Sequence, residues 1–394
     1  MTIKRICMVV QNYYEIDPRV RREAESLFEA GYAVDVLSLR MVKDRTKSFV
    51  LNGVNVYTVP LGKNRAGKLQ YILEYLSFFW WAFFTLTKYS LRRHYRVVHV
   101  NTLPDFLIFA AWVPKLMGAK LVLDMHEVMP EFYMSKFGVA ENHWMTKLLR
   151  WQERLSIAFA NHVITINVPV QALLESRGLA KGKFTIVMNS VDSQLFAPSL
   201  EYPERKRDDG AFVFMYHGTL TAMYGLDIAI RAFTIAIPRI CTAEFWILGD
   251  GPERANLANL ADQLGVAGKV KFFGKMPQQE IPAWLAQCDV GVLAMPQDIY
   301  LDLSFSNKLP EYIVMGKPVI ASRLKTLSYY FSERALAFFE PQNEFDLAER
   351  MVEICQNAKL RASLTTQASL EYTAIDWSVM KQRYLQVIES LLYS

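Results

Sequence analysis

Short apolar runs rich in β-branched residues alternate with longer segments of helical apolar spacing along this 394-residue chain. Such alternation is typical of βαβ units, in which crossover helices join parallel strands. The first unit is the clearest: a strand at 6–10 precedes a helix that we expect to begin near Pro18 and end at Gly31. The apolar stripe of that helix is predicted to contain Val20, Ala24, Leu27 and Phe28. The sequence therefore predicts an α/β fold.

The alternating pattern occurs twice. Strands are predicted at 34–39, 97–100, 120–125, 162–166 and 184–188, and again at 212–216, 244–248, 270–273, 290–293 and 318–321. A polar segment with proline and glycine, residues 199–210, predicts a linker between the two sets. We therefore expect two Rossmann-like domains, residues 1–195 and 210–375, whose parallel sheets face each other across a cleft. An amphipathic helix at 376–394 is expected to cross back and pack on the N-terminal domain.

The distribution of charge and the cysteines limit the kinds of binding partner and the cellular compartment that we expect. Residues 1–120 carry 18 lysines and arginines against nine acidic residues, whereas the whole chain has a net charge of +5. This basic part fits an anionic partner or is a solvated basic face. No nucleic-acid recognition motif accompanies it, so we expect no nucleic-acid partner. Reduced cytoplasmic thiols are the simplest interpretation of the four widely spaced cysteines, Cys7, Cys241, Cys288 and Cys355.

One aromatic segment, residues 68–96, indicates a lipid surface. Its uncharged part from Tyr75 to Thr87 is too short to span a bilayer. Tryptophans and phenylalanines flanked by lysines and arginines suit the membrane interface, whereas a buried crossover helix is the alternative. We expect neither a signal peptide nor a spanning helix. The predicted location is therefore cytoplasmic and peripheral, on the inner face of the cell membrane.

The turns after the strands limit the nucleotide chemistry. The first turn, residues 11–20, contains no glycine, whereas a dinucleotide-binding fold needs G-x-G-x-x-G there. A Walker phosphate loop, H-E-x-x-H and the cysteine–histidine spacings of zinc sites are absent from the sequence. NAD, ATP and zinc chemistry are therefore not expected.

An ordered set of motifs closely resembles the retaining glycosyltransferases of family 4, which have the GT-B fold. The set comprises MYHGTL (215–220), GLDIAIRAF (225–233), WILGDGPER (246–254), VKFFGKMP (270–277), CDVGVLAMP (288–296) and SFSNKLPEYIVMGKPVIAS (304–322). N-terminal segments beginning DPRVRREA, VVHVNTLPD and NSVDSQLFAP resemble members that build bacterial surface polysaccharides. The resemblance covers nearly the whole chain. It implies transfer of a hexose from a nucleoside diphosphate sugar, with UDP favoured, to a hydroxyl of a lipid-linked or polysaccharide acceptor, with retention and without a metal or other cofactor.

The donor site is expected in the C-terminal domain. Glu311 lies at the head of a predicted helix, where a carboxylate can accept hydrogen bonds from both ribose hydroxyls or merely stabilise the helix N-terminus. Gly218 follows a strand, so backbone N–H groups there can face a phosphate. Gly249 and Gly251 would let the backbone approach a ligand, or they are ordinary turn glycines. The other donor-binding residues that the resemblance implies are Thr219, Lys275, Met276, Ser306, Asn307 and Leu309.

The sequence departs from the family at three positions. The first glutamate of the family's paired-glutamate motif is replaced by Leu303, and two customary cations are replaced by Thr219 and Tyr224. A departing diphosphate nevertheless needs compensating positive charge. We therefore predict Lys308 as a catalytic residue. Further candidates for this charge, across the cleft, are Arg19, Arg21 and Arg22.

His126, in the DMHE segment 124–127, is the second predicted catalytic residue. The resemblance implies that it meets the donor sugar, where an imidazole can donate to a hydroxyl or to developing charge. The alternative is a capping or core histidine. The remaining acceptor or cleft candidates are His99, Asn101, Glu127 and Glu131.

Two other functions remain open at this point. A non-catalytic nucleotide-sugar-binding partner would bind the donor without turnover, which would fit the two missing cations. A GT-B sugar-nucleotide epimerase would convert its substrate without any acceptor.

Overall fold

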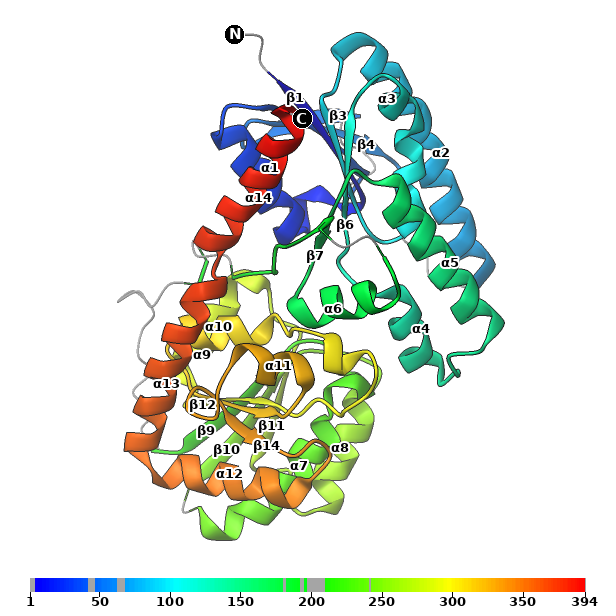
Figure 1. The fold of residues 1–394 in the computed structure, drawn as a ribbon. Coiled ribbons are helices and arrows are strands. Elements are labelled where there is room, and N and C mark those ends of the chain that lie inside the picture. The colour runs from blue at the N-terminus through cyan, green and yellow to red at the C-terminus, as the bar shows by residue number, and fades with distance from the viewer. Residues whose placement is uncertain are drawn as a thin grey trace. The chain divides into compact units, whose positions relative to one another are not determined.

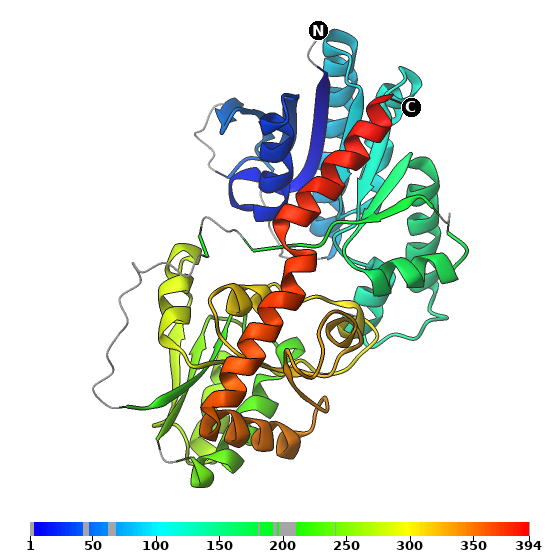
Figure 2. The same ribbon diagram turned by 60° about the vertical axis from the view of Figure 1, so that its left-hand side comes forward.

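The computed structural model describes residues 4–41, 47–61, 68–179, 182–191, 195–196, 210–240 and 242–393 (Figures 1 and 2). The chain divides into two compact units, one formed by Met1–Asn189 with Trp377–Ser394 and the other by Ser190–Asp376. Nearly all of the predicted linker at 199–210, and Cys241, lie outside the described residues.

The first unit is built on one sheet of strand order β3-β4-β2-β1-β5-β6-β7-β8. All neighbouring strands are parallel except β3 and β4, which form an antiparallel hairpin at the edge. The elements are β1 (Arg5–Tyr13), α1 (Pro18–Glu29), β2 (Ala33–Leu39), β3 (Ser48–Leu51), β4 (Val54–Val59), α2 (Lys68–Arg93), β5 (Val97–Asn101), the 3₁₀ helix η2 (Asp105–Ala111), α3 (Trp112–Leu116), β6 (Lys120–Asp124), α4 (Met129–Phe137), α5 (Trp144–Phe159), β7 (His162–Thr165), α6 (Val168–Ser176), β8 (Phe184–Ile186) and α14 (Trp377–Tyr393).

The start of α1 shows how local sequence sets this architecture. The Asp17 side chain accepts a hydrogen bond from the Val20 backbone N–H at 3.2 Å and so caps the helix, while Pro18 occupies its first position. The predicted apolar stripe is buried except at Phe28, which is 45% exposed. The Phe28 ring lies over Gly53, where a Cβ atom would be only 2.2 Å away.

Helices cover both faces of this sheet. In Figures 1 and 2, α1 and α14 lie together on one face, and α2, α3 and α5 lie on the other. The C-terminal helix α14 contacts α1, β5 and β8, so the last segment of the chain completes the core of the first unit. No helix in the described part of the chain is both long and apolar enough to cross a membrane.

The second unit has an all-parallel sheet of order β11-β10-β9-β12-β13-β14. Its core lies where α7, α8 and α12 pack on one another and on the sheet. The elements are β9 (Phe212–His217), α7 (Leu226–Ala236), β10 (Ala243–Leu248), α8 (Arg254–Gln263), β11 (Val270–Gly274), α9 (Ile281–Gln287), β12 (Val290–Leu293), α10 (Lys308–Val314), β13 (Val319–Ser322), α11 (Lys325–Tyr330), β14 (Ala337–Phe339), α12 (Glu344–Gln356) and α13 (Ala358–Tyr372).

Both sheets confirm the prediction of two Rossmann-like units. In each sheet the strand order reverses beside the first strand, at β1/β5 and at β9/β12. In open α/β sheets, ligands bind outside the carboxyl ends of the strands at this reversal. Ligand contacts are therefore expected at the turns that follow β1 and β5 in the first unit and β9 and β12 in the second.

Candidate functional site

The second unit has a pocket of about 490 Å³ at the carboxyl ends of its strands. This volume lies within the range of small-molecule sites, about 300–1,000 Å³. Seven of the predicted donor-site residues line it: Gly218, Thr219, Gly249, Lys275, Met276, Lys308 and Glu311. The other lining residues are Phe196, His217, Leu248, Asp250, Gln278 and Ile281.

Glu311 is held in this pocket by a histidine that sequence reasoning missed. Its Oε2 lies 2.5 Å from Nε2 of His217, the last residue of β9, and His217 is buried. The other ring nitrogen, Nδ1, lies 3.1 Å from the hydroxyl of Tyr312, which itself donates to the Met215 carbonyl at 2.8 Å. Both ring nitrogens of His217 are therefore engaged, Nδ1 with the Tyr312 hydroxyl and Nε2 with the Glu311 carboxylate, which fixes the orientation of the ring beside Glu311.

Lys308 begins α10, one turn before Glu311, and lines the same pocket. Its Nζ lies 4.0 Å from the centre of the Tyr224 ring and 5.3 Å from that of Tyr216. Burial lowers the pKa of Lys308 to about 8, although Glu311 acts in the opposite direction. Tyr224 thus places an aromatic face, which attracts a cation, where the family usually has a cation itself.

The glycines of the two turns pack against each other, and the Gly218 N–H does not face the pocket as expected. The Gly218 N–H donates to the Leu248 carbonyl at 2.8 Å, and the Gly249 N–H to the Gly274 carbonyl at 2.7 Å, so neither N–H faces the pocket. A Cβ atom on Gly249 would lie 1.7 Å from the Gly218 carbonyl oxygen, and one on Gly251 would lie 2.3 Å from that of Leu220. Glycine is required there because the two turns pack closely against each other.

Four of the predicted donor-binding residues do not line the pocket: Gly251, Ser306, Asn307 and Leu309. Leu309 is fully buried in the core, and Asn307 is exposed. Neighbouring residues of a turn and of the first helical turn point in different directions, which explains why Lys308 reaches the pocket and these neighbours do not.

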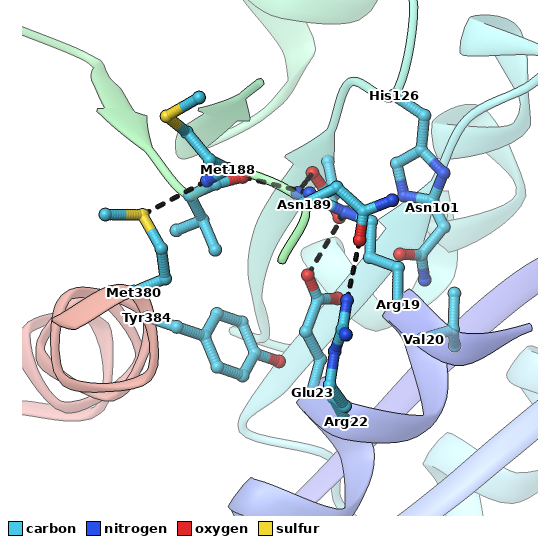
Figure 3. A network of polar contacts seen from close by, with 12 residues as sticks. Arg19, Val20, Arg22, Glu23, Asn101, His126, Met188, Asn189, Met380 and Tyr384 are labelled. Carbon is cyan, nitrogen blue, oxygen red and sulfur yellow. Dashed lines mark hydrogen bonds and ion pairs between the residues drawn. The ribbon is translucent and has the colours of Figure 1, made fainter. Parts of the chain in front are cut away.

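In the first unit, His126 follows β6 and belongs to a buried ion-pair network (Figure 3). Its Nε2 lies 3.0 Å from Oδ2 of Asp124, and its backbone N–H donates to the Thr102 hydroxyl at 3.0 Å. Arg19 donates to both oxygens of Asp124, from Nε at 3.0 Å and from Nη2 at 2.7 Å. The His126 side chain is 21% exposed, whereas Asp124 is fully buried.

The three arginines predicted as candidates to neutralise the diphosphate all have partners within the first unit, and only Arg19 is buried together with its partner. Arg19 is buried and paired with Asp124. Arg21 pairs with Glu25 one helical turn away, at 3.2 Å. Arg22 donates to the Asn189 side chain at 2.6 Å (Figure 3).

Three more cleft candidates prove to be core residues. His99 is fully buried with its Nδ1 2.9 Å from the Tyr384 hydroxyl of α14, and burial lowers its pKa. Asn101 is also buried and donates to the Val9 carbonyl at 3.3 Å. Glu131 is buried in an ion pair with Arg177. Glu127 is half-buried and stays a candidate.

One group of side chains in the first unit has the composition of a metal site. Among the described residues, Glu23, His99 and Asp124 form the one group of three whose potential ligand atoms lie within 4.8 Å of one another. Both oxygens of Asp124 already accept hydrogen bonds from Arg19, and one of them also faces His126. A metal ion would have to displace the guanidinium, so we interpret the group as an ion-pair network.

Comparison with known proteins places both units in described families. The family "Glycosyl transferases group 1" matches residues 211–357. The family "Glycosyl transferase 4-like domain" matches residues 16–190. Together the two matches cover most of the chain and correspond to its two sheets.

Individual relatives are distant. WbjE of Pseudomonas aeruginosa, a probable glycosyltransferase, is 24% identical over 252 residues, which are 61% of this chain and 61% of WbjE. LpsE of Rhizobium meliloti, a lipopolysaccharide core biosynthesis glycosyltransferase, is 36% identical over 88 residues, 22% of this chain and 24% of LpsE. The matches therefore span less than two thirds of either relative.

The fold is shared over the whole chain with a solved structure. The crystal structure of HepE from Anabaena in complex with UDP-glucose matches 98% of this chain and 99% of HepE with a TM-score of 0.72. The sequence identity is 17%, so this likeness concerns the fold.

Proposed function

This chain belongs to the group 1 glycosyltransferases of the GT-B fold, and from that premise we propose that it transfers a hexose from a nucleoside diphosphate sugar to a hydroxyl of a lipid-linked or polymeric glycan. UDP is the proposed nucleotide because HepE, which shares the fold, was solved with UDP-glucose. A surface-glycan acceptor is proposed because LpsE acts in lipopolysaccharide core biosynthesis. Retention of the anomeric configuration completes the proposal, and NMR of the product anomer tests it.

The observation that supports this function best is that Glu311 and Lys308 share one pocket. Glu311 keeps Oε1 free of hydrogen bonds to the described residues while His217 holds Oε2, so the carboxylate can accept from ribose hydroxyls. Lys308, one helical turn earlier, lines the same pocket and is proposed to contact the diphosphate. Lys275 and Met276, which follow β11, would then lie against the base.

We propose that the departing diphosphate is neutralised by lysine rather than by a metal ion. Lys308 is half-buried, and an anionic ligand beside it would favour its charged form. Lys275, whose backbone is proposed to lie beside the base, is exposed on the same pocket, so its side chain adds to the positive charge of the pocket. The reaction should therefore proceed unchanged after treatment with EDTA, and restoration of lost activity by Mg²⁺ or Mn²⁺ would contradict this.

The acceptor side of the proposal rests on an apolar surface of the first unit. Helices α2 and α5 both pack against η2 and share the same face of the sheet. Their outward sides expose large apolar residues at helical spacing: Leu73, Leu76, Trp80, Phe84 and Leu91 on α2, and Trp144, Leu148, Trp151 and Leu155 on α5. Exposed Lys88, Arg92, Lys147 and Arg154 lie among them. Aromatic and cationic side chains together suit an anionic lipid surface, so we propose peripheral attachment at the cytoplasmic face of the membrane.

Donor specificity is the first test. A thermal-shift panel of UDP-, GDP- and ADP-sugars should show stabilisation by a UDP-hexose, because a ligand that binds only the folded state raises its melting temperature. Incubation of that donor with lipid-linked glycan acceptors should then release UDP and lengthen the acceptor. Donor binding without release of nucleotide under any acceptor condition would instead favour the non-catalytic binding partner, and an altered sugar without acceptor would favour the epimerase.

A further inference from the structure

The ion-pair network of the first unit leads beyond the proposed function. We infer that Asp124 and Arg19 are positioning residues for His126. Arg19 holds the Asp124 carboxylate in place, and this carboxylate determines which nitrogen of the His126 imidazole carries the proton. It thereby determines which nitrogen is presented to the sugar. The inference rests on the proposed hexose transfer and on the predicted role of His126 in it.

The geometry decides the tautomer. Nε2 of His126 lies 3.0 Å from Oδ2 of Asp124. An ionised carboxylate only accepts hydrogen bonds, so Nε2 must carry the proton. Nδ1 makes no hydrogen bond to any residue in the described ranges, and in the neutral ring it bears a lone pair. His126 therefore presents an acceptor to a sugar hydroxyl, and it becomes a donor at Nδ1 only when the ring is charged.

Asp124 stays ionised, and so remains a hydrogen-bond acceptor, because the Arg19 guanidinium donates to both of its oxygens. Burial alone would raise the pKa of Asp124, but Arg19 and His126 hold it well below its usual value. The Oε1 atom of Glu23 also lies 3.3 Å from Nε of Arg19, but the Arg19 guanidinium donates to both oxygens of Asp124. Burial and the nearby Asp124 charge raise the pKa of Glu23 well above its usual value. Asp124 is therefore the ionised carboxylate of the pair.

The surrounding groups fix the network in place. Arg19 also donates from Nη1 to the Val187 carbonyl at 2.9 Å. Burial lowers the pKa of His99, so this ring next to Asp124 stays neutral, and the Tyr384 hydroxyl lies 2.9 Å from it. Figure 3 shows Glu23 and Tyr384 on the side of the network opposite His126. The charged and titratable groups around Asp124 thus come from α1, β5, α14 and the turn after β6.

A direct measurement of the tautomer tests the inference without any activity assay. In ¹⁵N-histidine NMR spectra of the full-length protein, the His126 signals are identified by their loss in His126→Gln. Neutral His126 should be protonated at Nε2, with a lone pair at Nδ1. A ring protonated at Nδ1 instead would overturn the inference, whatever the protein's activity.

A double-mutant cycle tests the consequence for transfer. We expect Asp124→Asn to lower kcat by about 10–100-fold, as loss of a supporting partner does at other sites, with the donor KM changed less than about threefold. In a His126→Gln background the same substitution should cost no more than about twofold, because the residue it positions is gone. Equal losses in both backgrounds would show a merely structural role and overturn the inference.

Two further variants keep the test decisive. If Asp124→Asn does not fold, Arg19→Lys replaces it in the test, because a lysine cannot donate to both carboxylate oxygens in the way that the guanidinium does. We expect Arg19→Lys to lower kcat by about 3–10-fold, and only when His126 is present. Arg177→Lys is the matched control, since it loosens another buried ion pair of the same unit, with Glu131 and Glu153. It should lower the melting temperature but leave kcat unchanged. Full activity of His126→Gln would refute the proposed role of His126 in transfer, while the NMR result would still decide its positioning.

Discussion

The alkaline limb of the pH–rate profile should belong to Lys308. Burial brings its pKa down to about 8, so about 90% of the side chain is charged at pH 7 and about 10% at pH 9. Only the charged form can compensate the departing diphosphate. Because kcat/KM reports the groups of the free enzyme, it should fall about tenfold for each pH unit above 8.

Substitutions separate Lys308 from other titrating groups. Lys308→Ala should lower kcat by about 100-fold or more, the scale for loss of one preorganised electrostatic donor, and should abolish the alkaline limb. Lys308→Arg should recover part of the rate and keep it level up to pH 10, because a guanidinium stays charged there. Initial rates of nucleotide release between pH 6 and 10 measure both effects. An unchanged limb near pH 8 in either variant, or near-normal turnover in the alanine variant, would refute the assignment.

Three other outcomes follow from the structure. Glu311→Gln should weaken donor binding by about 10–150-fold, or roughly 1.5–3 kcal/mol, because a charge-assisted contact to ribose becomes neutral; calorimetry showing unchanged affinity would remove Glu311 from the site. Trp80→Ser with Phe84→Ser should weaken sedimentation with anionic liposomes by at least about tenfold without unfolding the protein, since both side chains are exposed; undiminished sedimentation would argue against the α2 surface. Glu23→Gln should raise the melting temperature at pH 8 and less so at pH 5. The pKa of Glu23 is raised in the folded protein, so the stability that protonated Glu23 contributes is lost as the pH rises through that folded-state pKa. A wild type that is more stable than the variant at pH 8 would show that Glu23 is charged and paired with Arg19.

Local patterns were sufficient for the elements that carry the donor pocket. The strand–turn–helix order around Gly218, and the one-turn spacing of Lys308 and Glu311, are visible in the sequence, and the structure brings all three to one pocket. The edge hairpin of β3 and β4 had its own signal, the Asn52–Gly53 pair, both with positive φ (49° and 81°), which is typical of a tight β-turn.

Contacts between distant segments could not be predicted from the same patterns. His217 pairs with Glu311, 94 residues later, and at the end of an apolar strand it resembles any core histidine. Arg19 and Asp124 are 105 residues apart, and nothing in either local pattern identifies the other as a partner. For the same reason Arg19 was expected to face a phosphate, because a buried partner for its charge is visible only in the fold.

We propose that the second unit binds a nucleoside diphosphate hexose through Glu311 and Lys308 and that the chain transfers the hexose. Mass spectrometry of a reaction containing UDP-hexose and a lipid-linked glycan acceptor detects this transfer. We predict an acceptor product heavier by one hexose, formed together with UDP in equal amount, and loss of that product in the Glu311→Gln, Lys308→Ala double variant. Equal product formation by the double variant, or hexose transfer that does not release UDP, would contradict the claim.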